Sequence, residues 1–279
     1  MEKNLKIAYP GVPGSFSEQA LLNYFTEPVE VTGVRTFFDA FKLLDNNQVK
    51  YCIVPIENSC TGGIFEVFDA LHQFDFFITG ETYVKVCHHL LGCKNTELQN
   101  IEYVYSHYQG FQQSTKFLNQ YPHWVHVPYH NTAISAELVA DEQNPRKAAI
   151  ASERAADIYQ LKFLAKNIQD VNNNYTRFIV ISRQLSVRPN HDKISIIYAL
   201  PHNVGTLYRS LGIFADYGIN LLNLQSRPVK ELPWQVYFYL DLAGNLNEPN
   251  VRTALKKIQA ESHFFKILGS YAASSNKGV

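Results

Sequence analysis

Short apolar runs alternate with helical patterns over the first two thirds of the chain. Residues 7–9, 31–34 and 52–55 have the composition of buried strands, and helical patterns begin after Ser17 and at residues 37–44. A strand, a helix and a second strand in this order form the βαβ unit of an open sheet. The sequence therefore predicts an α/β fold.

The same pattern divides this region into two lobes. A second unit has expected strands near Val84, near Val104 and at 148–151, and the chain then returns to the first unit through 167–181. We expect a first domain at 1–183, with lobe one at about 1–80 plus 161–183 and lobe two at about 81–160. Loops at the strand ends of two such lobes face a shared cleft, where open α/β sheets bind ligands.

The order of the elements changes after a polar linker at 184–193. Strands are expected at 194–200, 221–229, 234–242 and 264–271, with helices at 205–216 and 251–260, a helix end at Gly218 and a turn at 230–233. The order βαββαβ is that of the ferredoxin-like unit. We therefore expect a separate second domain at 194–279.

Charge and hydropathy exclude several classes of protein. Lysine and arginine number 25, aspartate and glutamate also number 25, and the formal net charge is zero. There is accordingly no basic footprint for nucleic acid or for an anionic membrane. No apolar run approaches the ~20 residues of a membrane span, and the N-terminus leads into a strand rather than a signal peptide. A cytoplasmic location is expected.

Cysteine spacing gives no indication of a disulfide framework or a metal site. The four cysteines, Cys52, Cys60, Cys87 and Cys93, lack close pairs such as C-x-x-C. Cys87, His88 and His89 are expected on one strand, whose successive side chains point to opposite faces and do not converge on one ion. We expect no metal and no cofactor.

Candidate chemistry begins at Asn174-Tyr175-Thr176-Arg177-Phe178. A hydroxyl and a guanidinium stand side by side where a polar loop enters the apolar strand 179–181. Scaffolds often hold reacting groups at such a junction. The pair alone is also compatible with a simple strand entry.

Three other junctions join a strand to a helix. Gly11-Val12-Pro13-Gly14-Ser15-Phe16-Ser17 is a glycine-rich turn in which Ser15 and Glu18 have capping-box spacing. Pro55-Ile56-Glu57-Asn58-Ser59 with Gly62-Gly63 has the same organisation, and Ser106-His107 with Gln109 clusters a hydroxyl, an imidazole and an amide. Free backbone N–H groups at helix starts suit an anion. The first two junctions are therefore candidate anion sites.

These four motifs follow one another along the chain at residues 11–17, 55–63, 106–109 and 176–178. With the motifs in that order, the chain resembles the prephenate dehydratases over almost its whole length. The resemblance implies a two-lobed fold of the type II periplasmic-binding kind. It implies a carbon–oxygen lyase that converts prephenate to phenylpyruvate with loss of water and carbon dioxide. Such an enzyme must orient a dianion and donate a proton or hydrogen bond to the leaving hydroxyl.

The resemblance suggests a role for each motif. Thr176 is expected at the leaving hydroxyl, polarised by a neighbour, with Arg177 holding a carboxylate or orienting Thr176. Glu57 and His107 are the titratable candidates; Glu57 either supplies the proton or makes a structural hydrogen bond, and His107 either contacts substrate or ties its loops together. The expected substrate-binding residues are Ser15, which equally serves as a cap, and Asn58, Ser59, Thr61, Gly62, Ser106, Gln109 and Phe178.

The second domain resembles an ACT domain, the amino-acid-sensing module of biosynthetic enzymes. The resemblance implies allosteric binding of phenylalanine at Val204-Gly205-Thr206-Leu207 and Gln225-Ser226-Arg227-Pro228, where relatives usually carry Glu instead of Gln225. It also implies side-by-side pairing in a homodimer or homotetramer. No segment remains for a fused chorismate mutase domain, so a monofunctional enzyme is expected.

Two other interpretations remain open. Arogenate dehydratase performs the same chemistry on an amino side chain, and the motifs do not separate the two substrates. A non-catalytic two-lobed amino-acid sensor is the alternative from another class. The Thr176–Arg177 pair favours an enzyme, because a binder needs no donor of that kind.

Overall fold

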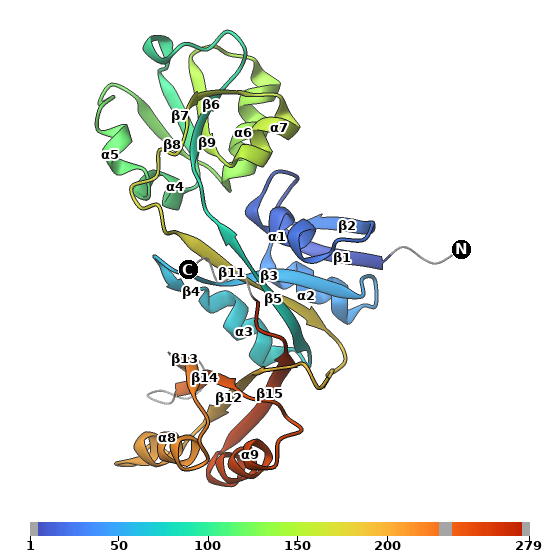
Figure 1. Ribbon diagram of the computed structural model, residues 1–279. Helices are drawn as coiled ribbons and strands as arrows, with labels where there is room; N and C mark the ends of the chain where they lie inside the picture. Colours follow the sequence, from blue (N-terminus) through green and yellow to red (C-terminus); the bar gives the residue numbers. More distant parts are fainter. Residues whose placement is uncertain (1–4, 229–235, 275–279) are drawn as a thin grey trace.

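The computed structural model describes residues 5–228 and 236–274, which form three parts in a row (Figure 1). The second lobe lies at one end, the first lobe in the middle and the C-terminal unit at the other end. Among the described residues, no helix combines the length and apolarity needed to cross a membrane.

Lobe one is a mixed sheet with helices against it. Its strands follow the order β5-β11-β3-β1-β2, with β1 parallel to β2 and β3, and β11 antiparallel to β3 and β5. The elements are β1 (Leu5–Pro10), α1 (Phe16–Tyr24), β2 (Val29–Val34), α2 (Phe37–Asp45), β3 (Tyr51–Asn58), β4 (Gly62–Gly63), α3 (Phe65–Gln73), β5 (Phe77–Lys85) and β11 (Tyr175–Ser182). The expected βαβ pattern is present in its first half.

Lobe two is a five-stranded sheet in the order β10-β6-β9-β7-β8. Its elements are β6 (His89–Gly92), η1 (Leu98–Asn100), β7 (Tyr103–Ser106), α4 (Tyr108–Gln112), α5 (Thr115–Leu118), β8 (Val125–Pro128), α6 (Thr132–Glu142), β9 (Lys147–Ala151), α7 (Glu153–Tyr159) and β10 (Lys162–Ala165). The expected boundaries shift here. Strand β5 reaches Lys85 within lobe one, and β10 pairs with β6, so lobe two extends to Ala165 rather than to about residue 160.

The two lobes contact each other away from the crossing segments. The Ser152 hydroxyl donates to the Gly14 carbonyl at 2.8 Å, and the Tyr159 hydroxyl donates to the Pro13 carbonyl at 2.9 Å. A Cβ on Gly14 would lie 2.9 Å from Ala155 Cα, so only glycine fits this approach. The glycine-rich turn of lobe one is thus packed against the start of α7.

The C-terminal unit has the expected ferredoxin-like topology, with strand order β13-β14-β12-β15. Its elements are β12 (Lys193–Ala199), α8 (Thr206–Asp216), β13 (Leu221–Pro228), β14 (Val236–Ala243), α9 (Pro249–Glu261) and β15 (Phe264–Tyr271). Gly218, with φ of +67°, follows the end of α8 as expected. The turn expected at 230–233 lies outside the described residues.

This unit is joined to lobe one by both backbone and core. Strand β15 pairs with β5 at Gly269 and Ile78, which makes one ten-stranded sheet of the two parts. The Tyr239 ring packs 4.7 Å from the Phe68 ring of α3, and its hydroxyl donates to the Phe68 carbonyl at 2.8 Å. The two parts therefore share one hydrophobic core.

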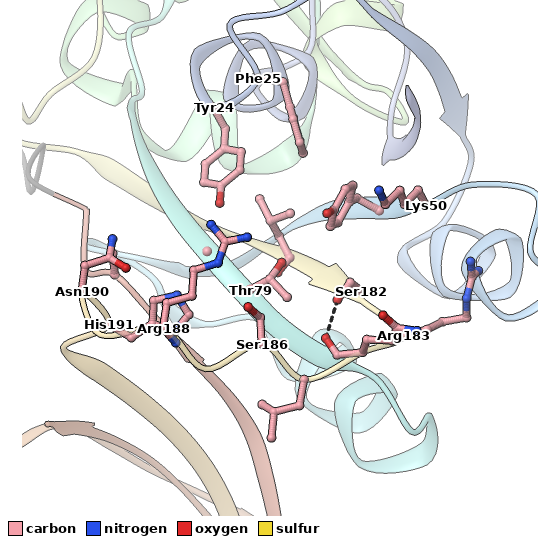
Figure 2. A pocket seen from close by; sticks show the side chains of 16 residues that line it. Tyr24, Phe25, Lys50, Thr79, Ser182, Arg183, Ser186, Arg188, Asn190 and His191 are labelled. Carbon is pink, nitrogen blue, oxygen red and sulfur yellow. Dashed lines mark hydrogen bonds between the residues drawn. The ribbon is translucent and has the colours of Figure 1, made fainter. Parts of the chain in front are cut away.

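A pocket of about 730 Å³ opens between lobe one and the segment that leads into the C-terminal unit (Figure 2). It lies beside Val180 and Ser182 on β11 and beside Thr79 on β5. Val180 lies four positions after Thr176 along β11, roughly 13 Å of extended strand. The pocket is therefore distinct from the Thr176 junction.

The close approach of β15 and β5 depends on Gly269. A Cβ at this position would lie 2.2 Å from the Ile78 carbonyl oxygen, which is backbone and cannot move aside cheaply. We expect Gly269→Ala to destabilise the protein by about 1–3 kcal/mol, measured by urea unfolding. Gly212→Ala is the matched control, since its Cβ meets nothing within 4 Å. Equal stability of the Gly269→Ala variant and the parent would contradict this role.

Candidate active site

The end of β3 and the start of β11 lie side by side and divide four motif residues between two faces. Thr176 pairs with Asn58, and Arg177 pairs with Glu57. Successive residues of a strand point to opposite faces of the sheet. Thr176 and Asn58 consequently share one face, and Arg177 and Glu57 share the other.

Asn58 is the centre of the polar cluster on the first face. Its side-chain N–H₂ donates to Asn174 Oδ1 at 2.6 Å and to Thr176 Oγ1 at 3.0 Å. Its Oδ1 accepts from the backbone N–H groups of Cys60 and Thr61, both at 3.0 Å. Because Asn58 donates into the Thr176 oxygen, the Thr176 proton is left to point elsewhere and is a stronger donor. Asn58 was expected to bind the substrate directly, but its amide groups are engaged within the protein. It has instead the geometry of the expected neighbour that polarises Thr176.

The loop that follows Asn58 is exposed but anchored. The Ser59 hydroxyl donates to the Asn173 carbonyl at 3.2 Å and accepts from the Tyr175 N–H at 2.9 Å. Ser59 and Thr61 are exposed, and Gly62 adopts φ of +81°. The loop is therefore held in a fixed position beside Thr176. Both of its hydroxyl protons are donated within the protein, since Thr61 Oγ1 also donates to Asn58 Oδ1 at 3.2 Å.

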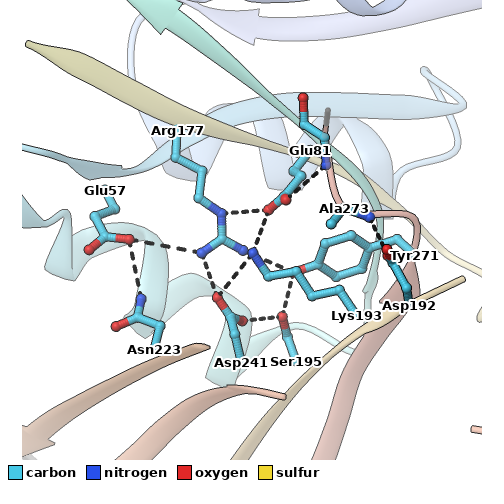
Figure 3. A network of polar contacts seen from close by, with 11 residues as sticks. Glu57, Glu81, Arg177, Asp192, Lys193, Ser195, Asn223, Asp241, Tyr271 and Ala273 are labelled. Atoms are coloured by element: carbon cyan, nitrogen blue, oxygen red, sulfur yellow. Dashed lines mark hydrogen bonds and ion pairs between the residues drawn. The ribbon is translucent and has the colours of Figure 1, made fainter. Parts of the chain in front are cut away.

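Arg177 lies elsewhere than expected, whereas Glu57 makes a structural hydrogen bond, one of its two expected roles (Figure 3). The Arg177 guanidinium donates from Nε to Glu81 at 2.7 Å, from Nη1 to Asp241 and from Nη2 to the Tyr271 hydroxyl at 2.9 Å. Glu57 accepts from the Asn223 side chain at 3.2 Å. Both side chains face the C-terminal unit because strand alternation turns them away from Thr176. The expectation that Arg177 orients Thr176 is corrected by this geometry.

Lys193 completes the buried ion cluster, which we define as Glu81, Arg177, Lys193 and Asp241. The Lys193 ammonium lies 2.9 Å from Glu81 and 3.7 Å from Asp241, so two cations face two carboxylates. Burial lowers the pKa of Arg177, but Tyr271, Asp241 and Glu81 outweigh it and the net shift is upward. For Asp241, burial raises the pKa of the carboxyl, but the positive charges of Arg177 and Lys193 outweigh burial and the net shift is downward. Both partners therefore remain charged inside the protein.

The first expected anion site is occupied by the protein itself. Ser15 caps α1 by accepting from the Glu18 N–H at 3.3 Å, and the Glu18 carboxylate accepts from the Gly14 N–H at 2.8 Å. Arg154 of lobe two pairs with the same carboxylate at 2.7 Å. Ser15 thus acts as a cap here, and the turn serves contact between the lobes.

The lobe-two motif is divided between core and surface. Ser106 is fully buried and donates to the Ile150 carbonyl at 3.0 Å, so it does not face a substrate. His107 is partly buried and caps α4 by accepting from the Gln109 N–H at 3.3 Å, while the Gln109 side chain is exposed. Burial lowers the pKa of His107, so the imidazole is neutral at pH 7. His107 and Gln109 remain available to a ligand, whereas Ser106 does not.

Phe178 is also placed differently from the expectation. It is 1% exposed and packs with Ile7, Tyr9 and Leu21 in the core of lobe one. An aromatic residue at this position of the motif serves to pack β11 against α1. A substrate contact for Phe178 is therefore not supported by this structure.

Two buried residues were given no site role from the sequence. Asn174 is 1% exposed and accepts the hydrogen bond from Asn58 described above. Its position two residues before Thr176 was the only feature of the sequence that could have indicated this role. His88 is 3% exposed in the crossing segment between the lobes, where Nε2 lies 2.9 Å from Gln113 Oε1 and its ring meets Phe16 edge-on. Its Nδ1 has no hydrogen-bond partner among the described residues. Only the fold brings these groups together.

The two expected effector segments differ in exposure. Val204 is 98% exposed, Gly205 has φ of +80° at the start of α8, Thr206 donates to the Asn203 carbonyl and Leu207 is half-buried. On β13, Ser226 and Pro228 face solvent, whereas Gln225 and Arg227 face lobe one. Arg227 binds Asp69 of α3 through two N–H···O bonds of 2.9 Å.

The fold is that of a two-lobed α/β enzyme with an added ferredoxin-like unit, and comparison with known proteins identifies the family. The family model described as "Prephenate dehydratase" matches residues 7–186. A bifunctional chorismate mutase/prephenate dehydratase of Aquifex aeolicus is 35% identical over 97% of this chain and 74% of that protein. The chain belongs to the prephenate dehydratase family.

Solved structures agree with this assignment over nearly the full length. A prephenate dehydratase from Arthrobacter aurescens, in complex with L-Phe, has a TM-score of 0.87 and 28% identity, covering 96% of this chain and 90% of that one. GqqA, described as a novel type of quorum quenching acylase, has a TM-score of 0.87 and 26% identity, covering 97% and 98% of the two chains. The expected fold class is confirmed by these likenesses.

His88 makes the stability of the folded protein depend on pH. Burial lowers its pKa, and the hydrogen bond with Gln113 only partly opposes the shift. The unfolded chain takes up a proton near pH ~6.5, whereas the folded protein resists it, so stability is lost as the pH falls below that value. We expect His88→Gln to flatten the decline of unfolding free energy below pH ~6.5, measured by urea unfolding.

The control for this prediction is His123→Gln, since His123 is exposed. The control should retain the decline of the parent protein. An unchanged decline in the His88→Gln variant would show that His88 is not a source of the acid sensitivity.

Proposed function

We propose that this protein is a prephenate dehydratase, a carbon–oxygen lyase that forms phenylpyruvate with loss of water and carbon dioxide. Membership of the family supports the reaction. The observation that carries the proposal is the 3.0 Å hydrogen bond from Asn58 to Thr176 Oγ1. This bond prepares a neutral hydroxyl as a donor at the entrance to the loop 58–63.

Thr176 is proposed to donate to the departing 4-hydroxyl of prephenate. A threonine hydroxyl is a weak acid, but donation from Asn58 polarises it and fixes the direction of its proton. Loss of carbon dioxide together with the hydroxyl makes the ring aromatic, so the substrate supplies much of the driving force. The protein's task is then orientation and hydrogen bonding rather than strong acid catalysis.

Neutral donors are proposed to bind the substrate carboxylates. Ser59 and Thr61 are exposed beside Thr176, and on binding their hydroxyls would exchange the Asn173 carbonyl and Asn58 Oδ1 for the substrate carboxylate. The backbone at Gly62 adds N–H groups. Neutral donors hold an anion with less desolvation than a buried lysine. His107 and Gln109, at the start of α4, are proposed to contact the substrate from lobe two. Glu57 and Arg177 are proposed to act from behind the site, not on the substrate.

The C-terminal unit is proposed to be an ACT domain that binds phenylalanine and inhibits the enzyme. The relative from Arthrobacter aurescens was solved with L-Phe, and this chain has the same overall fold. Gly205 lets a ligand approach the backbone at the start of α8. Gln225 lacks the charge of the usual glutamate, so weaker phenylalanine binding is expected than for a Gln225→Glu variant.

Assembly and location complete the proposal. Strand β13 is an edge of the ten-stranded sheet, and Leu222 and Leu224 on its outer side are partly exposed. Side-by-side pairing of two C-terminal units would cover this edge, giving a homodimer or homotetramer. A cytoplasmic location is proposed, in keeping with a biosynthetic enzyme.

The function predicts a specific result for Thr176. Thr176→Ala should lower kcat at least a hundredfold with a small change in KM, because the lost hydrogen bond strengthens in the transition state. Thr176→Ser should retain much of the activity, since the hydroxyl remains. The measurement is formation of phenylpyruvate from prephenate by the purified protein.

Thr253→Ala on α9 is the control for loss of a threonine hydroxyl, because Thr253 is exposed and bonds only the Pro249 carbonyl among the described residues. An assay with arogenate in parallel distinguishes a prephenate dehydratase from an arogenate dehydratase. Near-parental turnover of Thr176→Ala would remove Thr176 from the mechanism. If the parent protein is inactive on both substrates, the result would favour the non-catalytic sensor.

A further inference from the structure

The inner side of β13 contacts the segment that carries the substrate loop. Its alternate residues Asn223, Gln225 and Arg227 point the same way, toward lobe one. Asn223 donates to Glu57, the residue before Asn58, at 3.2 Å. Gln225 lies 3.8 Å from a Cβ built at Gly63. These two contacts lie behind the loop 58–63.

Arg227 extends this contact to the helix that follows the loop. It is bidentate to Asp69, and its guanidinium lies 4.7 Å above the Phe65 ring at the start of α3. Both partners of the ion pair are mostly shielded, with 23% and 29% of the side chains exposed. A two-bond arginine pair of this kind fixes orientation as well as distance.

The neighbouring strands β12 and β14 are tied to lobe one by buried ion pairs, and β13 contributes no residue to them. The buried ion cluster joins β5 and β11 to β12 and β14. Because water has little access to the cluster, a charge that lost its partner would stay unsolvated, at a high cost in free energy. Within one subunit, β13 pairs only with β14 among the described strands, and its other edge faces the position proposed above for a second subunit. It is the element of the C-terminal unit best able to shift against the loop 58–63.

We propose that β13 is the coupling strand between effector and active site within one subunit. This inference rests on the proposed function and names the route of its regulation. Gln225 and Arg227 belong to the expected effector segment and already contact lobe one. A ligand that engages this segment changes the Asn223–Glu57 and Arg227–Asp69 contacts, and through them the backbone that positions Asn58.

Two variants test this route without touching the substrate face. Asn223→Ala removes the contact with Glu57, and Asp69→Asn weakens the pair with Arg227. Both should bind phenylalanine within about threefold of the parent by calorimetry and keep kcat within about twofold. Maximal inhibition by phenylalanine should fall to less than half of the parental value. Asp216→Asn, exposed on α8, is the control and should be inhibited like the parent.

The outcomes separate this inference from the proposed function. Full inhibition in both variants would overturn the coupling role of β13, while their activity would leave the dehydratase assignment intact. Loss of phenylalanine binding in both would also overturn it, since the contacts would then build the effector site itself. If the parent has no dehydratase activity, phenylalanine-dependent hydrogen-exchange protection of the loop 58–63 still supports the coupling, and unchanged exchange overturns it.

The pocket at the linker carries a second, independent inference. Its described lining includes Lys50, Arg183 and Arg188 and contains no aspartate or glutamate. Arg183 is engaged by the Leu44 and Val49 carbonyls, but no described residue makes a hydrogen bond or ion pair with the Arg188 guanidinium, which points toward Tyr24 (Figure 2). Burial raises the pKa of Tyr24, which therefore stays neutral beside it.

The walls of this pocket suit an aromatic body as well as an anion. Phe25 and Tyr51 pack with ring centroids 5.7 Å apart on one side, and Thr79 and Ser186 add hydroxyl groups. We infer that the pocket binds a small aromatic carboxylate, with the carboxylate on Arg188 and the ring against Tyr24 and Tyr51. Such a ligand would lie between lobe one and the linker to the C-terminal unit.

Benzoate is the probe for this site, and inorganic phosphate tests an anion without a ring. Benzoate should bind the parent and the Thr176→Ala variant equally in ligand-observed NMR titrations. Arg188→Gln should weaken binding at least tenfold, and Arg252→Gln, exposed on α9, should not. No saturable benzoate binding to the parent, binding insensitive to Arg188→Gln, or phosphate binding as tightly as benzoate would each overturn the inference.

Discussion

The buried pairing of Arg177 with Glu81 and Asp241 is the constraint on which the rest of the structure depends. Arg177 comes from lobe one, Asp241 and Lys193 come from the C-terminal unit, and all are nearly excluded from solvent. Removing one member would leave a buried charge uncompensated, at a cost of about 3–5 kcal/mol. The cluster therefore fixes the orientation of the C-terminal sheet against the strands that carry the active site.

Strand alternation gives the two neighbours Thr176 and Arg177 different tasks. Thr176 shares its face with Asn58, and Arg177 shares the opposite face with Glu57. A change in the packing behind β3 and β11 is thus only one peptide unit from the groups proposed to contact the substrate. This short motif therefore joins the hydroxyl proposed to react to an interdomain anchor, which gives the proposed regulation a short route to the proposed site.

The sequence predicted the architecture better than it predicted the roles of single residues. Periodicity and turn residues were sufficient for two lobes and the βαββαβ unit, because these signals are local. The motif residues Arg177, Ser106 and Phe178 were expected at the substrate, yet they are held by Asp241, the Ile150 carbonyl and the core of lobe one. Those partners are distant in sequence, so no local pattern distinguishes a buried structural contact from a catalytic one. Likewise, the neighbouring Thr176 and Arg177 at a strand entry indicated that Thr176 was a candidate. The sequence did not indicate that Asn58 donates a hydrogen bond to it.

A crystal structure of the protein with bound phenylpyruvate would test this division of faces most directly. We expect the product's carboxylate to contact the hydroxyl or backbone groups of residues 59–62, near the Thr176 hydroxyl. The Arg177 guanidinium should remain on Glu81 and Asp241. An Arg177 side chain that leaves these carboxylates and binds the product would contradict the assignment of Arg177 to anchoring and restore it to substrate binding.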